Sequence, residues 1–260
     1  MARATPQDRI RQVGVSAAEI FCVVGTLYGV GVLGTRVEES SGGALAADAT
    51  RLAPAGPAFS IWSVIYLGLA AYTVWQWLPS QSARSLHRRI GWWVAASMVL
   101  NATWLLVTQQ GWIWLSVVVI LVLALVLGLL LKRLTPRPRP RVVERVAVDG
   151  TFGLYLGWVA VATCANVTAA LVSSGVEPGP VWGDLAAVLV LAVVAGLGVL
   201  FARVLGGRYA VAAAMAWGLA WIAVARVTDE PESIVTAIAA GIVALLVLAA
   251  PVAMPHRIAR

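Results

Sequence analysis

The sequence predicts an all-α, polytopic membrane protein, a bundle of about eight transmembrane helices. Two observations on composition support this class: 60% of the 260 residues are hydrophobic and only 12% are charged, about half the charged share of a soluble domain. The third observation is spacing, because apolar runs approach the ~20 residues that a membrane-spanning helix needs. The runs lie at 16–34, 58–78, 90–109, 112–131, 150–172, 182–203, 208–226 and 233–252.

The basic residues between the runs indicate a topology. Most of the 19 lie at the N-terminus, in the second, fourth and sixth gaps, or in the C-terminal tail, whereas the other gaps are mainly acidic. Cytoplasmic loops of membrane proteins carry an excess of Lys and Arg, so we predict a multi-pass protein of the cell membrane with both termini cytoplasmic. The formal net charge of +7 reflects this topology, and we expect the lipid bilayer, not nucleic acid, as a partner.

The first run and the gap after it have distinct features. Gly25 and Gly29 form a GxxxG motif, which lets two helix backbones approach closely, although glycine is also common in membrane helices generally. The gap from Thr35 to Pro57 is long, acidic and rich in small residues. A gap of this kind predicts a lid or mobile loop over the outer end of the bundle.

The second run, within Pro54–Pro79, carries polar aromatic residues at helical spacing. Trp62 and Tyr66 lie one turn apart. In hydrocarbon each polar group without a partner costs several kcal/mol, so we expect this face to meet other helices or a ligand. Trp75 and Trp77 fit the same face or, equally, an interfacial aromatic belt.

The third and fifth runs share a pattern, a Trp-Val-Ala sequence with an asparagine eight positions after the tryptophan. In the third run Asn101 and Trp104 share a helix face, and in the fifth Trp158, Ala162 and Asn166 do so. An asparagine in mid-membrane must find a hydrogen-bond partner. The two asparagines either join helices or, with the tryptophans, line one pocket beside the second run.

The fourth gap and the last three runs carry features of membrane anchoring and helix packing rather than of a reactive site. The fourth gap, Thr135–Arg141, alternates proline with arginine, which predicts an extended segment near anionic headgroups. In the seventh run Trp217 and Trp221 lie one turn apart, and Arg226 follows near acidic residues, where we expect a solvated ion pair of little energetic value. The last three runs either cover the side of the bundle or replace a partner subunit.

The chain shows no pattern of a catalytic or metal site. Cys22 and Cys164 lie in separate runs, and His87 and His256 stand alone in basic gaps, so ligand spacing for a metal is absent and no cofactor is expected. Nucleophile–base pairs are also absent, which argues against an enzyme. Acidic residues of the runs, such as Glu19, are read as lying near run ends, which argues against ion-coupled transport.

Three spaced motifs carry a resemblance to a known family. They are Ile61-Trp62-Ser63-Val64-Ile65-Tyr66 in the second run, Leu100-Asn101-Ala102-Thr103-Trp104 in the third, and Tyr155-Leu156-Gly157-Trp158 through Ala162 to Asn166 in the fifth. In order and placement they resemble the TspO/MBR family, the tryptophan-rich sensory or translocator proteins. The resemblance covers roughly residues 15–175 and implies two parts, a TspO-like five-helix bundle (1–175) and three additional transmembrane helices (176–260).

The resemblance also implies a function. The family binds porphyrins and other hydrophobic ligands in a pocket between these helices, which here would be lined by Trp62, Tyr66, Asn101, Trp104, Trp158, Ala162 and Asn166. The expected partner is a hydrophobic small molecule such as a tetrapyrrole, and the expected role is sensing or transport. A homodimer is a further possible partner. The alternative is a small-molecule permease that is not coupled to an ion gradient. The family's Pro-Pro-x-Trp element and its proline before Tyr155 are missing here, which indicates a divergent branch.

Overall fold

The structure is a computed structural model that describes residues 4–135 and 141–253. Within these residues the chain is helical, without a strand, and holds eight helices that are long and apolar enough to cross a membrane. The predicted fold class is therefore confirmed. The long helices are α1 (Pro6–Gly29), α2 (Ile61–Trp75), α3 (Ser85–Gln109), α4 (Ile113–Leu134), α6 (Thr151–Ser173), α7 (Pro180–Val204), α8 (Tyr209–Thr228) and α9 (Ile234–Ala253).

Short elements connect two of these helices to the preceding chain. A 3-10 turn (Gly56–Ser60) leads directly into α2. The short helix α5 (Val142–Glu144) continues through a π-helical segment (Arg145–Gly150) into α6. Some residues on which the predicted topology depends lie outside the described residues: the arginines at positions 3, 137, 139, 257 and 260, and His256. Most of the predicted Thr135–Arg141 anchor lies outside them as well.

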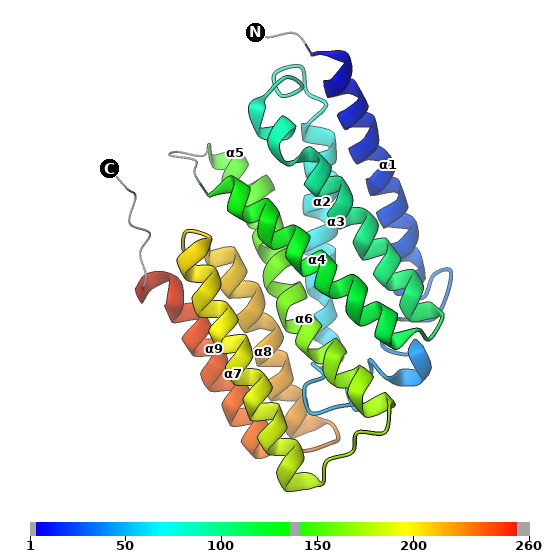
Figure 1. Ribbon diagram of the computed structural model, residues 1–260, viewed down its shortest axis with the longest axis vertical. Helices are drawn as coiled ribbons and strands as arrows, with labels where there is room; N and C mark the ends of the chain where they lie inside the picture. Colours follow the sequence, from blue (N-terminus) through cyan, green and yellow to red (C-terminus); the bar gives the residue numbers. More distant parts are fainter. Residues whose placement is uncertain (1–3, 136–140, 254–260) are drawn as a thin grey trace.

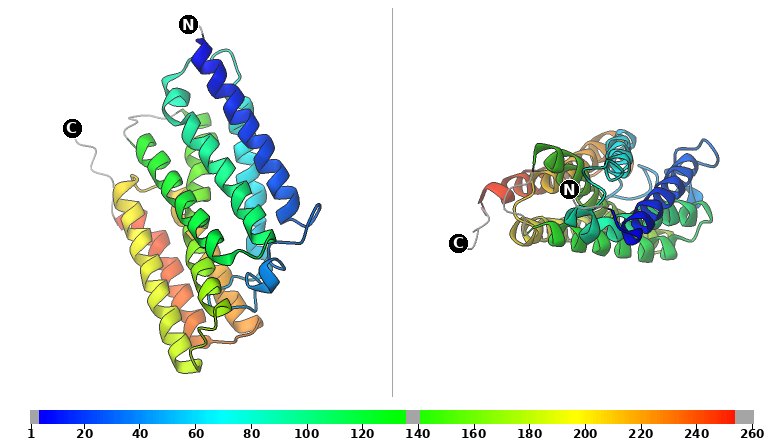
Figure 2. Two further views of the ribbon diagram at one scale, coloured as in Figure 1. Left: turned by 45° about the vertical axis from the view of Figure 1, so that its right-hand side comes forward. Right: turned by 90° about the horizontal axis from the view of Figure 1, so that it is seen from above.

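The helices run up and down, and α6 lies at their centre. Along the bundle α1 packs on α3, α3 on α4, and α4 on α6, while α2 covers another side of α6. On its far side α6 packs on α8, and α8, α9 and α7 form the second group of helices in Figures 1 and 2. A Cβ at Gly157 of α6 would lie 2.3 Å from the backbone oxygen of Val211 in α8. The glycine therefore permits close packing between the first five long helices and the last three.

The GxxxG motif of α1 serves helix packing. A Cβ at Gly25 would lie 2.7 Å from Cα of Ala102 in α3, and one at Gly29 would lie 2.5 Å from the Leu105 side chain. Real Cβ atoms do not come that close to backbone, so only glycine at position 25 allows this approach of α1 to α3, whereas at Gly29 the Leu105 side chain would have to shift. The predicted close contact is confirmed, and α3 is the helix that α1 meets.

The first helix begins ten residues earlier than the apolar run. Thr5 caps it, because its side chain accepts from the Asp8 N–H while the Asp8 carboxylate accepts from the Thr5 N–H, a complete capping box. The polar first turns are then fixed by Asp8, which accepts from Arg88 at 2.8 and 2.6 Å and from Arg11 at 3.0 Å. Hydropathy misses these turns because their buried groups are charged and paired.

The earlier start of α1 moves Glu19 to the middle of the helix. With α1 spanning Pro6–Gly29, the reading that Glu19 lies near a run end is wrong. The argument against ion-coupled transport, which depended on it, no longer holds.

Helix α1 begins and α9 ends at the same end of the bundle (Figure 1). We call it the basic end, because the α2–α3 and α7–α8 connections there carry Arg84 and Arg208. The opposite end, with the Thr35–Pro57 loop and the α8–α9 turn, is the acidic end.

Candidate functional site

The predicted aromatic residues of α2 pack onto α6. The rings of Trp62 and Tyr66 stack with centroids 5.2 Å apart and planes inclined by 13°. The Trp62 ring also meets the edges of Tyr155 and Trp158, with centroid distances of 5.8 and 6.2 Å. Such edge contacts are the favoured geometry of aromatic pairs. Tyr155 was not among the predicted site residues, although its hydroxyl donates to Ser97 O at 3.1 Å and ties α6 to α3.

Asn101 links α1, α2 and α3. Its side-chain nitrogen donates to the Tyr66 hydroxyl at 3.0 Å and lies 3.6 Å from Cys22 Sγ. Its Oδ1 is buried and has no partner among the described residues. The asparagine therefore joins helices, as one of the two predicted readings requires, and still presents an unused acceptor in the middle of the bundle.

Asn166 makes the corresponding link between α3, α4 and α6. Its Oδ1 accepts from the Trp104 indole N–H at 2.8 Å, and its nitrogen donates to Ser116 Oγ at 3.0 Å. Asn166 and Ser116 are 1% and 0% exposed. This network fixes the orientation of the Trp104 ring, and no pattern in the sequence indicated that Ser116 would be part of it.

A small cavity lies between these groups and the loop after α1. Its volume is about 40 Å³. Four of the seven predicted site residues line it, Trp104, Trp158, Ala162 and Asn166, together with Val37, Leu45, Pro54, Phe59, Val161 and Ala165. The other three, Trp62, Tyr66 and Asn101, do not line it. They contact one another in sequence, and Trp62 meets the Trp158 ring. The seven residues thus form two adjoining groups that meet at Trp158.

The Trp158 indole N–H is the unusual polar group at this cavity. The side chain is 2% exposed, and Nε1 has no hydrogen-bond partner among the described residues. Phe59 covers the ring edge-on, with centroids 5.7 Å apart. A buried N–H normally finds a partner, so Trp158 is a cavity-lining residue whose donor is unused.

The Thr35–Pro57 loop closes the cavity and is held by the last three helices. Arg226 of α8 is 0% exposed and donates to the carbonyls of Thr50 (2.9 Å), Ala47 (2.7 Å) and Pro231 (3.0 Å). The prediction of a solvated ion pair at Arg226 is therefore wrong, because the guanidinium is buried and donates its hydrogen bonds to backbone oxygens.

Two further contacts hold the same segment of chain. Arg51 pairs with Asp184 of α7 at 2.8 Å, and the Trp217 indole donates to Ala58 O at 2.9 Å. At the other end of the loop, burial raises the pKa of the Glu38 carboxyl above its usual range, an effect that Arg36 opposes and Glu39 increases. The last three helices thus cover the bundle and anchor its loop, a role that the sequence left open.

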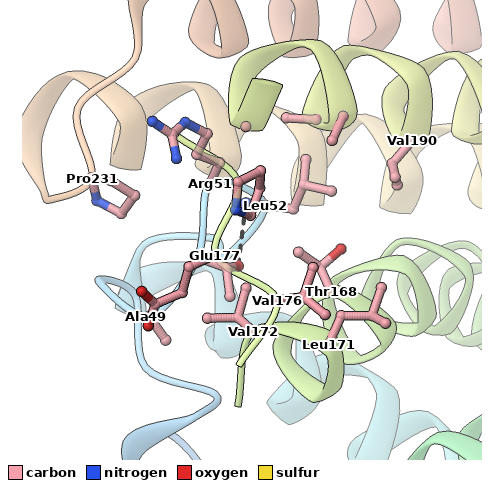
Figure 3. Close-up of a pocket in the computed structure, with 15 residues that line it drawn as sticks. Ala49, Arg51, Leu52, Thr168, Leu171, Val172, Val176, Glu177, Val190 and Pro231 are labelled. Atoms are coloured by element: carbon pink, nitrogen blue, oxygen red, sulfur yellow. Dashed lines mark hydrogen bonds between the residues drawn. The ribbon is translucent and has the colours of Figure 1, made fainter. Parts of the chain in front are cut away.

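A second cavity lies on the other side of the loop, at the acidic end. It holds about 250 Å³ between Ala49–Leu52, the end of α6 and the start of α7. Figure 3 shows the apolar side chains of Leu171, Val172 and Val190 around it, with Arg51 and Glu177 at its edge. Most of its walls carry no polar group, so it suits an apolar occupant and offers little to orient one.

Trp75 and Trp77, which fitted either the polar aromatic helix face or an interfacial belt, have different surroundings in the structure. Trp75 packs edge-on against His87, with centroids 4.8 Å apart, and His87 Nδ1 lies 3.2 Å from the Tyr72 hydroxyl. Trp77 is 39% exposed and donates to Ser16 at 2.9 Å. Trp75 therefore belongs to the packed interior, and only Trp77 has the exposure of a belt residue. His87, which was assigned to a basic gap, lies in the first turns of α3 and is fully buried.

Within the described residues no group of three or more His, Cys, Asp or Glu side chains is placed to hold a metal ion. In the comparison with protein families, the family model described as TSPO-like protein matches residues 16–251. No curated protein and no solved structure matches the chain. The matched segment extends from α1 to α9, so it includes the last three helices as well as the three motifs of α2, α3 and α6.

Proposed function

The chain belongs to the TSPO-like protein family, and on that premise we propose that it binds a flat hydrophobic molecule, such as a tetrapyrrole, beside Trp158. Family membership and the helices make it a multi-pass membrane protein with a sensory or translocator-type role. In this proposal the protein lies in the cell membrane with both termini cytoplasmic, and ligand binding, not catalysis, is its activity.

The observation that carries the proposal is the unpaired Trp158 N–H at the cavity. Ligand sites are mostly apolar concavities with a few fixed polar groups, and here aromatic walls surround one free donor. Trp104 is already paired with Asn166, so Trp158 is the donor that remains for an acceptor atom of the ligand. Ala162 and Ala165 contribute only methyl groups to the same wall, so they compete for no polar atom of the ligand.

The cavity is too small for the ligand while the loop is closed. Its 40 Å³ has room for about one water molecule, whereas pockets for drug-sized ligands measure about 300–1,000 Å³. Binding therefore requires that Val37, Leu45 and Phe59 withdraw from the rings. The loop anchors on α7 and α8 would then control access, so the last three helices take part in binding without touching the ligand.

Fluorescence titration tests the proposal. Purified protein is titrated with protoporphyrin IX and, separately, haem, and saturable quenching of tryptophan emission is expected. Trp158→Phe keeps a ring and removes the free N–H, so affinity should fall. Trp182→Phe is the matched control, because Trp182 is 68% exposed on α7. Equal affinities in the two variants would reject the assignment of Trp158, and unsaturable quenching would reject tetrapyrroles as the ligand class.

A further inference from the structure

Glu19 is an acidic residue in the middle of a membrane-spanning helix. The 24-residue helix α1 is about 36 Å long at ~1.5 Å per residue, and Glu19 lies about 15 Å from its acidic end. Its Oε2 is buried and has no partner among the described residues. Ionisable residues at this depth are costly, and they usually mark a pathway for ions or protons.

The surroundings of Glu19 offer no compensating charge. The groups within electrostatic range are Cys22 of the same helix, Tyr66 of α2 and Tyr155 of α6, and the nearby polar group of α3 is the amide of Asn101, which contacts both Cys22 and Tyr66. Thiols and phenols are ordinarily neutral near pH 7. The Glu19 side chain is half-buried, with Oε2 fully buried. A carboxylate removed from water without a cation beside it is unfavourable, which favours its protonated form.

Other polar atoms without partners connect this position to the basic end. Among the described residues, four buried side-chain oxygens lack a partner: Gln76 Oε1, Thr73 Oγ1, Glu19 Oε2 and Asn101 Oδ1. All four belong to α1, α3 or the α2 segment that ends at Gln76. Such oxygens are normally satisfied by ordered water when no protein donor reaches them.

The order of these oxygens along α2 follows from the helix pairing. At the basic end Gln12 donates to Gln76 O at 2.7 Å, and Gln76 donates back to Gln12 O at 3.4 Å. Thr73 lies about one turn further into the membrane, and Tyr66, which holds Asn101, about two turns beyond it. Glu19, two turns beyond Gln12 on the antiparallel α1, falls between Thr73 and Asn101. Helix α1 packs mainly on α3 and touches α2 less, so the α1–α2 seam is the less tightly paired side of α1.

We propose that a file of buried water along the α1–α2 seam leads from the basic end to Glu19, and that Glu19 reversibly binds a proton there. In the step a hydronium ion of the file gives its proton to the carboxylate, and a neutral carboxylic acid and a water molecule result. The seam ends at Asn101 and Tyr66, which also belong to the proposed ligand site. That last link rests on the proposed function: ligand and proton would then alter each other's affinity by the same factor.

Infrared difference spectroscopy on the reconstituted protein without ligand tests the proton site. A pH step should change the carbonyl band of a protonated carboxylic acid, and the isosteric variant Glu19→Gln should lose that band. Glu38→Gln, which removes a carboxyl of the loop, is the control and should keep it. No such band in the wild-type protein at any pH, or an unchanged band in Glu19→Gln, would overturn the proposal whatever the result with tetrapyrroles.

The water file has its own test, the rate at which the Glu19 band shifts after transfer to D₂O. Thr73→Val removes one oxygen of the file and should slow the shift. Thr163→Val is the matched control, since both threonines are 9% exposed but Thr163 Oγ1 already donates to Val159 O within α6. Equal rates in the two variants would show that protons reach Glu19 by another way and would overturn the proposed route.

Discussion

Replacing Arg226 with alanine should release the Thr35–Pro57 loop from α8. The guanidinium is fully buried and donates to three backbone carbonyls, two of them in the loop, at 2.7–3.0 Å. Alanine removes every one of these donors and leaves the carbonyls of Ala47 and Thr50 to water. The loop then loses the Arg226 link to α8 and keeps the Arg51–Asp184 pair to α7, while the helices keep their own packing.

The size of the effect follows from the hydrogen bonds. A bond that involves a charged group contributes about 1.5–3 kcal/mol. The three bonds share one group and are not additive, and carbonyls near the acidic end regain water when the loop opens. We therefore expect a loss of about 2–4 kcal/mol in the free energy of loop closure. At ~1.4 kcal/mol per factor of ten, the open population rises about 30- to 700-fold.

Hydrogen exchange measures this population directly, because protected amides exchange only from the open form. The reporters are the N–H groups of Ser40 and Ala46, which donate to carbonyls inside the loop. Both should exchange faster in Arg226→Ala, whereas peptides of α4 should be unchanged. Arg226→Lys keeps the charge but not the geometry of the guanidinium, so its exchange rates at these amides should lie between those of the wild type and those of Arg226→Ala. Unchanged protection of the loop in Arg226→Ala would refute the reasoning, since other contacts would then hold it.

Three further predictions concern packing, polar links and pH. Gly25→Ala places a methyl group against the α3 backbone and should lower the unfolding temperature, whereas Gly128→Ala of α4, which meets open space, should be neutral or gain up to about 1 kcal/mol; equal effects would contradict the close approach. Asn166→Ala leaves the Trp104 N–H unpaired and should cost about 1–2 kcal/mol in the free energy of unfolding, with a change in tryptophan emission. The raised pKa of Glu38 means that the folded protein holds this proton more tightly than the unfolded chain. Stability should therefore be greatest below the unfolded pKa of about 4.3 and fall as pH rises through the folded value, and thermal unfolding of Glu38→Gln should show a smaller pH slope than the wild type.

The helices were predictable because each must bury about 20 apolar residues, and composition alone reveals such runs. The start of α1 was not, since its first turns are polar. Their stability comes from the bonds of Asp8 to Arg88 and Arg11, whose partners lie up to 80 residues apart. The Thr5–Asp8 capping box is a local signal that could have located the helix start, and with it the central position of Glu19.

The candidate site was predictable in its residues more than in their contacts. Spacing identified Asn101 and Asn166 as polar groups that need partners, and both have them. Which atoms serve as partners depends on how neighbouring helices face one another, so nothing indicated that Ser116 would bind Asn166 or that Tyr155, a residue of the fifth-run motif, would bind Ser97. The role of Arg226 was hidden for the same reason, because its acceptors are backbone carbonyls of a distant loop.

The most direct test of the central claim is to fill the cavity without removing any polar group. Ala162→Val adds two methyl groups at the 40 Å³ cavity, and Ala186→Val adds them at the larger cavity of Figure 3. If the ligand binds beside Trp158, protoporphyrin IX should lose affinity in Ala162→Val and keep it in Ala186→Val, with both proteins folded. Unchanged affinity in Ala162→Val together with a loss in Ala186→Val would contradict the account and place the ligand between α6 and α7.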